Sequence, residues 1–359
     1  MRLDPLELDD VMPPPPGRCL LPAHRAEAIR LLLSGGSAVD FHRTHFDEYA
    51  DIDDLLGLFL LDPSDPFDRR RLRYLLAEAA AYVEEIRGVR IPSEVRNPAD
   101  VRDLFRWASD VSGVRRRQMA ACMVLKMMHL IQHMESADLK LRADVSEYDL
   151  QELANARVVA ASESLRRTHG WAHAFYGSRK TRSSVIQKLL LKRENVAATI
   201  FDKLRYRLVV ATPDDLVDAL DWLLTHLIPF PLIVPGNTRN NLLDPTAVES
   251  RTHPDARPAL HPHLEESGPV DGMTNPFSGR DYRMINLVAD LPVRLPDRVL
   301  PGGQPTEQLG RIVHALVEVQ VVDAVTNATN QIGENAHTEY KARQWRRASD
   351  RLARGAYVR

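Results

Sequence analysis

The chain has 359 residues, of which 44% are apolar and 27% are charged, and its formal net charge is −2 at pH 7. This balance is typical of folded globular proteins, and the length allows two domains with a buried core. No apolar run approaches the roughly 20 residues that span a bilayer, and the first residues lack the pattern of a signal peptide. The two cysteines, Cys19 and Cys122, fit neither a metal-ligand spacing nor a disulfide framework. We therefore expect a cytoplasmic protein with no membrane partner.

The small net charge hides an uneven distribution of charge along the chain. Residues 40–68 are rich in aspartate, whereas residues 166–207 are rich in lysine and arginine. A local basic field of this kind suits a ligand that carries phosphate groups. For any single lysine or arginine of the segment, a solvated helix face is the favoured alternative.

The first part of the chain predicts an irregular leader followed by helices. Residues 1–25 contain the proline run 13–16 and little periodicity, which is typical of an irregular or polyproline II segment. From there to about residue 165, apolar residues recur at helical spacing. Helices are predicted over 26–33, 70–86, 99–109 and 114–135, and the apolar stripe of 70–86 comprises Leu72, Leu75, Leu76, Ala79, Tyr82, Val83 and Ile86.

Segment 114–135 is the most apolar of these predicted helices. Its apolar stripe comprises Met119, Cys122, Leu125, Met128 and Ile131. Methionine fills irregular gaps in protein cores, so we interpret this stripe as core packing and assign it no cofactor. His129 and His133 are four residues apart and could share a metal ion, but no third ligand accompanies them. Ordinary packing or capping is the favoured interpretation of this pair.

After about residue 200 the apolar period changes from helical to alternating, which indicates strands. Residues 229–280, rich in Pro, Asn, Gly and His, predict a long loop or flap. Strands are predicted over 204–210, 282–295 and 315–322, and helices over 214–227 and 324–354. This order predicts an α+β fold, in which an all-helical N-terminal domain (26–160) precedes a mixed β-sheet domain with flanking helices (161–359).

The predicted strand 315–322 carries polar side chains on one face. Glu318 and Gln320 alternate with valines, so period-two geometry places the carboxylate and the amide on the same side of the sheet. Asp202 lies just before the predicted strand 204–210, whose outward face carries Arg207. If the two strands are neighbours, Asp202 and Glu318 form an acidic pair beside an arginine, which is what a Mg²⁺–triphosphate site requires. A strand with one face in water is the alternative.

Residues 177–188 predict a basic turn that opens with a glycine and enters an amphipathic helix. Arg179 and Lys180 would lie at the helix entry, where the helix dipole and free N–H groups favour anions. The glycine–lysine–hydroxyl order of a Walker loop is absent. Taken alone, this segment is a weak signal for phosphate binding.

Four sequence blocks of the C-terminal half together resemble the RelA/SpoT synthetase domain, a nucleotidyltransferase-type pyrophosphokinase. The similarity extends over roughly residues 165–345. The last block has the family's internal spacing without gaps and is the most specific. The blocks are Gly177…Lys180…Ser184…Lys188; Asp202-Lys-Leu-Arg-Tyr-Arg207; Tyr282-Arg-Met-Ile-Asn286; and Glu318-Val-Gln320 followed by Gly333, Ala336, His337, Tyr340 and Lys341.

The resemblance implies a reaction, its ligands and the roles of the site residues. The family transfers the β,γ-pyrophosphate of ATP to the 3′-hydroxyl of a guanosine nucleotide, so ATP and GDP or GTP are the expected ligands and alarmone synthesis in the stringent response is the expected role. Asp202 and Glu318 would hold Mg²⁺, and Glu318 would also help to deprotonate the attacking hydroxyl. The other implied roles are triphosphate contacts by Arg179, Lys180, Ser184, Lys188 and Arg207, base stacking by Tyr282 with Asn286 and Gln320 on the nucleotide side, and contacts of His337 and Lys341 with acceptor phosphates or ribose.

Several positions depart from the family's pattern, mostly on the acceptor side. Ser178 stands where the family has an arginine, which occurs one residue later as Arg179, and Asn286 replaces a histidine. Val322-Asp323 replaces an Arg-Thr pair, and Gln331 a glutamate. Transfer to another 3′-hydroxyl, such as a tRNA end, therefore stays open, as does a catalytically inactive nucleotide- or RNA-binding protein.

The helical half carries no His-Asp hydrolase motif, so no hydrolase activity is predicted. That half could instead regulate the site or bind a partner, and homo-oligomer formation is left open. An interaction protein, in which the sheet domain is only a scaffold, is the third alternative.

Overall fold

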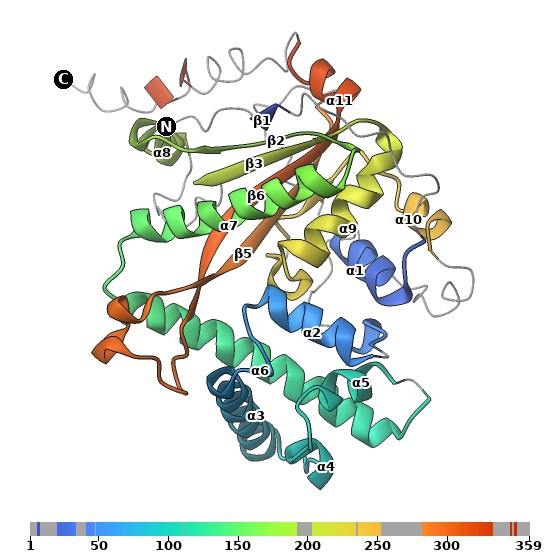
Figure 1. Cartoon of the computed structure of the whole chain (residues 1–359), viewed down its shortest axis with the longest axis vertical. Coiled ribbons are helices and arrows are strands. Elements are labelled where there is room, and N and C mark those ends of the chain that lie inside the picture. Colours follow the sequence, from blue (N-terminus) through green and yellow to red (C-terminus); the bar gives the residue numbers. More distant parts are fainter. Residues whose placement is uncertain are drawn as a thin grey trace, which may run out of the picture.

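The chain folds into a mixed β-sheet with helices packed on one of its faces and a group of helices at one end (Figure 1). The computed structural model describes residues 6–7, 20–33, 41–46, 48–110, 112–191, 203–234, 236–252, 282–332, 345–346 and 348–349. None of the helices in these ranges combines the length and the hydropathy that a membrane span requires.

The N-terminal half is helical, as predicted, and its helix ends follow local capping signals. Helix α3 begins after Asp65, whose side chain accepts the N–H of Asp68, and ends at Gly88, whose φ of 62° is left-handed. Ser146 caps α7 in the same way. The bounds are α1 Ala23–Leu33, α2 Tyr49–Leu58, α3 Pro66–Arg87, α4 Ser93–Arg96, α5 Asp103–Ser109, α6 Arg115–Arg142 and α7 Glu147–Thr168.

Within the described residues the sheet has six strands in the order β1-β2-β3-β6-β5-β4. The pair β3–β6 is parallel and the other neighbouring pairs are antiparallel. The bounds are β1 Leu6–Glu7, β2 Ala172–Arg179, β3 Leu204–Val210, β4 Arg239–Asn240, β5 Ile285–Arg294 and β6 Ile312–Asp323; the helices of this half are α8 Arg182–Leu191, α9 Leu216–His226, α10 Thr246–Ser250 and α11 Ala324–Thr329. The predicted strands 204–210 and 315–322 are thus neighbours, which is the condition stated for the acidic pair.

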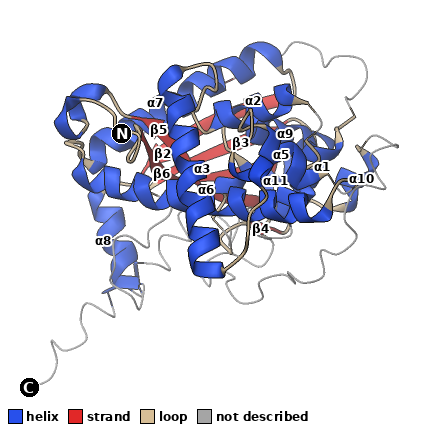
Figure 2. Cartoon of the chain, turned by 90° about the horizontal axis from the view of Figure 1, so that it is seen from below, coloured by secondary structure: helices blue, strands red, loops and turns tan. Residues whose placement is uncertain are grey.

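One face of the sheet is covered by α7 and α9, as Figure 1 shows, and the helices form a layer against the strands in Figure 2. Strand β3 turns Leu204, Tyr206 and Leu208 to this face, and each is at most 3% exposed. The Tyr206 hydroxyl donates to Oδ1 of Asn155 on α7 at 3.0 Å. Burial of these side chains leaves the opposite face of the sheet for polar residues.

The buried side chains form one continuous cluster that runs from Leu21 to Val321. Helices α1 and α2 pack on α9, and α6 packs on α3, α5 and β6. Arg157 of α7 joins three segments, because its guanidinium donates to the carbonyl oxygens of Leu58, Leu227 and Pro292. Burial lowers the pKa of Arg157 to about 10. The helical half and the sheet thus share a core, and a domain boundary near residue 160 stays a prediction.

Several secondary-structure predictions need correction. Residues 172–179 form a strand, so Gly177 lies inside β2 and not in a turn. The helix predicted over 324–354 is interrupted after Thr329, and most of the residues from 333 to 354 lie outside the described ranges. The predicted loop 229–280 contains β4 and α10. Tyr82 and Ile86, predicted on the core side of their helix, are 44% and 63% exposed, and Met119 is 54% exposed. These three lie near ends of their helices, where fewer neighbouring elements cover the apolar stripe.

Candidate functional site

The face of the sheet opposite α7 carries a row of polar side chains, one from each of five adjacent strands. The strand register places Tyr176 opposite Arg207, Arg207 opposite Gln320, Gln320 opposite Asn286, and Asn286 opposite Arg239. Side chains of neighbouring strands at the same register point to the same side. The row therefore brings together residues from positions 176 to 320 of the chain.

Arg207 is the centre of this row. Its Nε and Nη2 donate to Oε1 of Gln320 at 3.2 and 2.7 Å, Nη2 donates to the Tyr282 hydroxyl at 2.7 Å, and Nη1 donates to Oδ1 of Asn327 at 3.0 Å. All three partners are neutral. In the described part of the chain no carboxylate neutralises this guanidinium, so its full charge is available to an anion.

Glu318 lies next to the row, two residues before Gln320 on β6. Nε2 of Gln320 donates to Oε1 of Glu318 at 2.8 Å, while the other carboxylate oxygen has no hydrogen-bond partner among the described residues. The Gln320 amide thus separates the Glu318 carboxylate from the Arg207 guanidinium instead of letting them form an ion pair. Among the described residues, the site thus presents a carboxylate and a guanidinium side by side, neither of them in an ion pair.

Tyr282 is held just before the start of β5 by two asparagines. Asn241 donates to the Tyr282 carbonyl and accepts the Met284 N–H, both at 2.8 Å. On the other side Asn330 accepts the Arg283 N–H at 3.1 Å and donates to the Arg283 carbonyl. These amides bond the backbone just before Ile285, the first residue of β5, so the Tyr282 hydroxyl is positioned to meet Arg207.

Asn286 and Arg239 extend the row towards the edge of the sheet. Asn286 is only 8% exposed, and its Oδ1 has no hydrogen-bond partner within the described residues. Ile285 and Leu287 are fully buried in the core, while Asn286 faces the site side. A buried amide oxygen without a partner is energetically costly and suits contact with a ligand that donates a hydrogen bond.

The structure does not bring Arg179 into the row. Arg179 lies one residue after Ser178, and a one-residue step in a strand turns the side chain to the other face. Its Nη1 donates to Oε1 of Glu152 on α7 at 2.7 Å, and the guanidinium lies 4.2 Å from the centre of the Tyr148 ring. Ser178 occupies the site face, opposite Arg205. This placement does not support the predicted contact of Arg179 with the triphosphate, which stays a prediction.

Other predicted residues follow β2 in the chain. The Lys180 N–H donates to the Lys203 carbonyl at 2.9 Å, which places Lys180 beside the start of β3. Helix α8 carries Ser184 and Lys188. The hydroxyl and N–H of Ser184 lie 3.0 and 3.3 Å from the Thr181 hydroxyl, so Ser184 serves the first turn of the helix. The contacts of these three side chains with ATP remain predictions.

Asp202, His337 and Lys341 lie outside the described residues, and their predicted roles stay predictions. The described part holds no group of three or more His, Cys, Asp or Glu side chains suited to a metal ion. Mg²⁺ binds one or two carboxylates and completes its coordination with phosphate and water. The free oxygen of Glu318 fits this mode, in which a substrate supplies most of the ligands.

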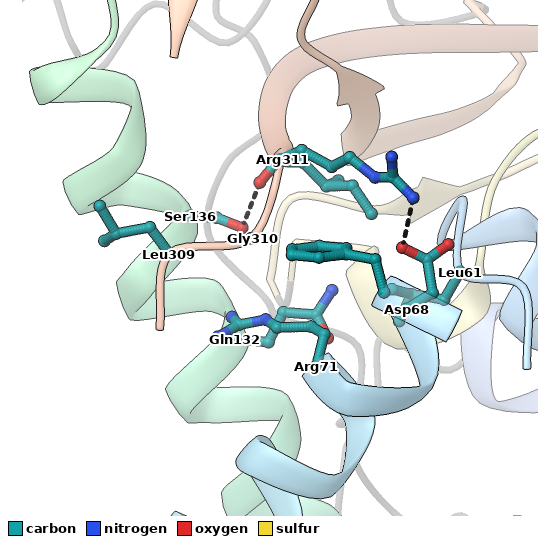
Figure 3. A pocket seen from close by; sticks show the side chains of 10 residues that line it. Leu61, Asp68, Arg71, Gln132, Ser136, Leu309, Gly310 and Arg311 are labelled. Carbon is teal, nitrogen blue, oxygen red and sulfur yellow. Dashed lines mark hydrogen bonds and ion pairs between the residues drawn. The ribbon is translucent and has the colours of Figure 1, made fainter. Parts of the chain in front are cut away.

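A separate small cavity lies between α3, α6 and the start of β6 (Figure 3). Its volume of about 10 Å³ is room for roughly one water molecule. Asp68, Arg71, Ser136 and Arg311 line it, and the Ser136 hydroxyl donates to the Ile312 carbonyl at 2.9 Å. This cavity is too small for a nucleotide and belongs to the packing of the helices on the sheet.

Sequence reasoning missed several residues of the site. Tyr176 was missed because strand β2 was not predicted, and its alternation with Ser178 could have suggested it. Asn241, Asn327 and Asn330 come from loop or helix-end positions, where no periodicity marks a residue that points at a sheet. Arg239 lies in a two-residue edge strand, which is too short for any pattern.

Comparison with protein-family models finds no match, and comparison with curated proteins finds none either. Among solved structures, the chain is similar to small alarmone synthetase 2 from Bacillus subtilis, with 15% identity and a TM-score of 0.28 over 58% of this chain and 94% of that one. Small alarmone synthetase 1 from the same organism has 17% identity and a TM-score of 0.31, over 56% and 85% of the two chains. A GTP pyrophosphokinase family protein from Streptococcus pneumoniae has 14% identity and a TM-score of 0.30, over 56% and 83%.

Proposed function

We propose that the chain is an ATP-dependent pyrophosphokinase that transfers the β,γ-pyrophosphate of ATP to the 3′-hydroxyl of a guanosine nucleotide, the reaction of alarmone synthesis. The observation that carries this proposal is the Arg207–Gln320–Glu318 arrangement on one face of two adjacent parallel strands. This arrangement joins two of the sequence blocks that resemble RelA/SpoT synthetases, the block that ends at Arg207 and the block that begins at Glu318. A polyphosphate needs both a cation and a metal-binding carboxylate, and this face supplies them within one hydrogen-bonded unit.

Each residue of the site would have a different role in the reaction. Phosphoryl transfer depends chiefly on positioning and charge neutralisation. Arg207 would offset the charge that develops as AMP leaves, and Gln320 would hold both Arg207 and Glu318 in orientation. The free oxygen of Glu318 would accept the proton of the attacking 3′-hydroxyl. Tyr282, held by Asn241 and Asn330, would stack the acceptor base.

Mg²⁺ would be held by Glu318 together with Asp202. When bound, it would neutralise phosphate oxygens of ATP and keep them in line with the acceptor. The chain's own residues then orient the acceptor and move its proton.

The proposal is tested with purified full-length protein, Mg²⁺ and γ-labelled ATP. GDP, GTP, ADP and deacylated tRNA are supplied separately as acceptors, and both labelled product and AMP are measured. We expect label in GDP or GTP in a one-to-one ratio with AMP. Label in tRNA alone would favour the tRNA 3′ end as the acceptor. This alternative is open because Asn286 stands where the family has a histidine. ATP binding without transfer to any acceptor would instead identify a nucleotide-binding protein and overturn the enzymatic proposal.

A further inference from the structure

Tyr176 belongs to the polar row of the sheet, but the proposed reaction leaves it without a role. The strand register places it opposite Arg207. The preceding residue, Phe175, packs against the Tyr206 ring on the covered face. Because successive side chains of a strand point to opposite faces, the Tyr176 side chain lies on the same side of the sheet as Arg207. An aromatic ring thus stands beside the guanidinium that we assign to the polyphosphate.

The surroundings of Tyr176 leave room for a flat ligand. Its neighbours on the same face of β2 are Ala174 and Ser178, whose side chains are small. Strand β1 pairs with Phe175 and Ala174 and, as far as the structure describes it, stops short of Tyr176. Among the described residues, no hydrogen bond holds the Tyr176 hydroxyl, and no aromatic ring or guanidinium stacks on its ring. The side chain is half-buried, so part of it is accessible to a ligand.

An accessible ring beside a phosphate-binding arginine suits a nucleobase. Every nucleobase has a flat π face, and stacking on an aromatic side chain binds it without hydrogen bonds. A phosphate group is not attracted to the face of an aromatic ring, because that face carries partial negative charge. The ligand that fits Tyr176 is therefore the base of a nucleotide whose phosphates lie at Arg207.

The strand order indicates which of the two nucleotides this is. Tyr282 lies just before β5, whereas Tyr176 lies on β2, beyond both β3 and β6. Neighbouring strands are about 4.8 Å apart, so β2 lies roughly 10 Å from β6. In the order of the strands, Arg207 on β3 and Glu318 on β6 lie between the two tyrosines. Each of the two nucleotides thus has a ring of its own on one side of the reacting groups.

We propose that the Tyr176 ring stacks the adenine of ATP, while Tyr282 stacks the acceptor base. This assignment rests on the proposed function, because it places the donor nucleotide on the β2 side of that site. Stacking tolerates any base. Tyr176 therefore strengthens the binding of a purine nucleoside triphosphate without selecting adenine over guanine.

Calorimetric titrations of the full-length protein with ATP and with inorganic tripolyphosphate, both in the presence of Mg²⁺, test the assignment. Tripolyphosphate has the phosphates of ATP but no base. Tyr176→Leu keeps an apolar side chain and removes the π face, so the Kd for ATP should rise about tenfold. The Kd for tripolyphosphate should stay within about twofold of the wild type, and Tyr176→Phe, which keeps the ring, should bind ATP within about twofold.

Tyr82→Leu is the matched control, because Tyr82 is 44% exposed on α3 in the helical half, and it should change neither Kd. The midpoint of thermal unfolding checks that Tyr176→Leu keeps its fold. An unchanged Kd for ATP in Tyr176→Leu, or an equal loss for tripolyphosphate, would overturn the assignment. A loss of ATP affinity in Tyr176→Phe would contradict it as well, because the hydroxyl and not the ring would then make the contact.

GDP separates the two tyrosines and the two proposals. The Kd for GDP should stay within about twofold in Tyr176→Leu, and a loss confined to GDP would reverse the roles of the two rings and overturn the assignment. If ATP binding depends on Tyr176 but no acceptor is labelled, the proposed reaction fails while Tyr176 stands as a nucleotide-binding residue. Transfer that Tyr176→Leu leaves unchanged, with unchanged ATP affinity, would have the opposite meaning.

Discussion

At the scale of single residues, the site depends on keeping opposite charges apart. An ion pair between Arg207 and Glu318 would satisfy both groups and leave neither for a ligand. Gln320 prevents this, because its carbonyl oxygen accepts from Arg207 and its amide nitrogen donates to Glu318. Gln320 is 3% exposed, so its orientation is fixed by packing as well as by hydrogen bonds.

Glu318→Gln tests the role of the carboxylate. The variant keeps the size of the side chain but removes its charge and its basicity, so we expect transfer to fall at least about 100-fold. The fold should persist because the side chain points away from the valine core. The measurements are label transfer from ATP and the midpoint of thermal unfolding, with Asp297→Asn, an exposed position, as the control. Normal transfer by Glu318→Gln would show that the site is elsewhere.

A pair of arginine variants tests which face of the sheet binds the polyphosphate. Arg207→Ala removes a guanidinium bonded only to neutral groups and should weaken ATP binding about tenfold or more, as expected for a charged contact. Arg179→Ala removes a guanidinium that Glu152 already neutralises on the opposite face, so ATP affinity should stay within about twofold of the wild type. Calorimetric titration with ATP measures both. Equal losses in the two variants would contradict the face assignment.

At the scale of elements, a buried charge network joins α3 to the hairpin of β5 and β6. Asp68 is 1% exposed and accepts Nη2 of Arg294 at 3.1 Å and Nη2 of Arg311 at 3.0 Å. Arg294 ends β5 and Arg311 precedes β6, so one carboxylate holds both ends of the connection. Beside it, Arg71 donates to the Glu307 and Gln308 carbonyls, and Gly310, with a φ of 69°, lets this turn approach Arg71 closely.

Asp68→Ala should therefore cost about 3–5 kcal/mol of unfolding free energy, since it leaves two arginines without their buried partner. Glu307→Ala is the matched control, because the Arg70–Glu307 pair has a similar distance of 2.9 Å but is 56% and 49% exposed. The control should cost less than about 1 kcal/mol. Urea unfolding followed by circular dichroism gives both values. Equal costs would mean that burial does not strengthen this network.

At the scale of the whole molecule, histidines lie where the helical half meets the sheet. The rings of His133 on α6 and His314 on β6 stack with their centres 5.3 Å apart, and His129 lies 6.5 Å from His133. Burial lowers the pKa of His129 and of His314 to about 4. A hydrogen bond from His133 to Asp290, 2.9 Å long, raises the pKa of His133. Lys140 also lowers the pKa of His314.

These shifts predict how stability depends on pH. His129 and His314 stay neutral in the folded chain but bind protons in the unfolded chain below about pH 6.5, so stability falls as pH drops from about 6.5 to 4. His133 acts in the opposite sense: it stabilises the fold below the unfolded pKa, and that contribution is lost as pH rises through its raised folded pKa. Because His129 and His314 together outweigh His133, we expect the free energy of unfolding to fall between about pH 6.5 and 4.

Urea unfolding at several pH values measures this loss in the wild type and in His314→Leu. The variant should show a shallower decline, because one of the two neutral buried histidines is gone. His173→Leu, at an exposed position on β2, is the control and should keep the wild-type slope. An unchanged slope in His314→Leu would contradict the assignment.

The sequence by itself determined the parts of the protein that depend on local periodicity. Alternation placed Arg207, Glu318 and Gln320 on the polar side of their strands, because successive side chains of a strand must point to opposite faces. Helical spacing located α3 and α6 for the same kind of reason, but it did not single out α7. Within the C-terminal half, strand β3 was predicted with its observed bounds.

Only the tertiary structure decided which of these side chains lie side by side. The row across five strands depends on register, and register is set by pairing between segments up to about a hundred residues apart. The face of Arg179 follows from the pairing of β2 with β3. Asn241 follows β4 and Asn330 follows α11, and both converge on the residues just before β5. Hydrogen bonds between segments far apart in the sequence fix these positions, so no local sequence pattern predicts them.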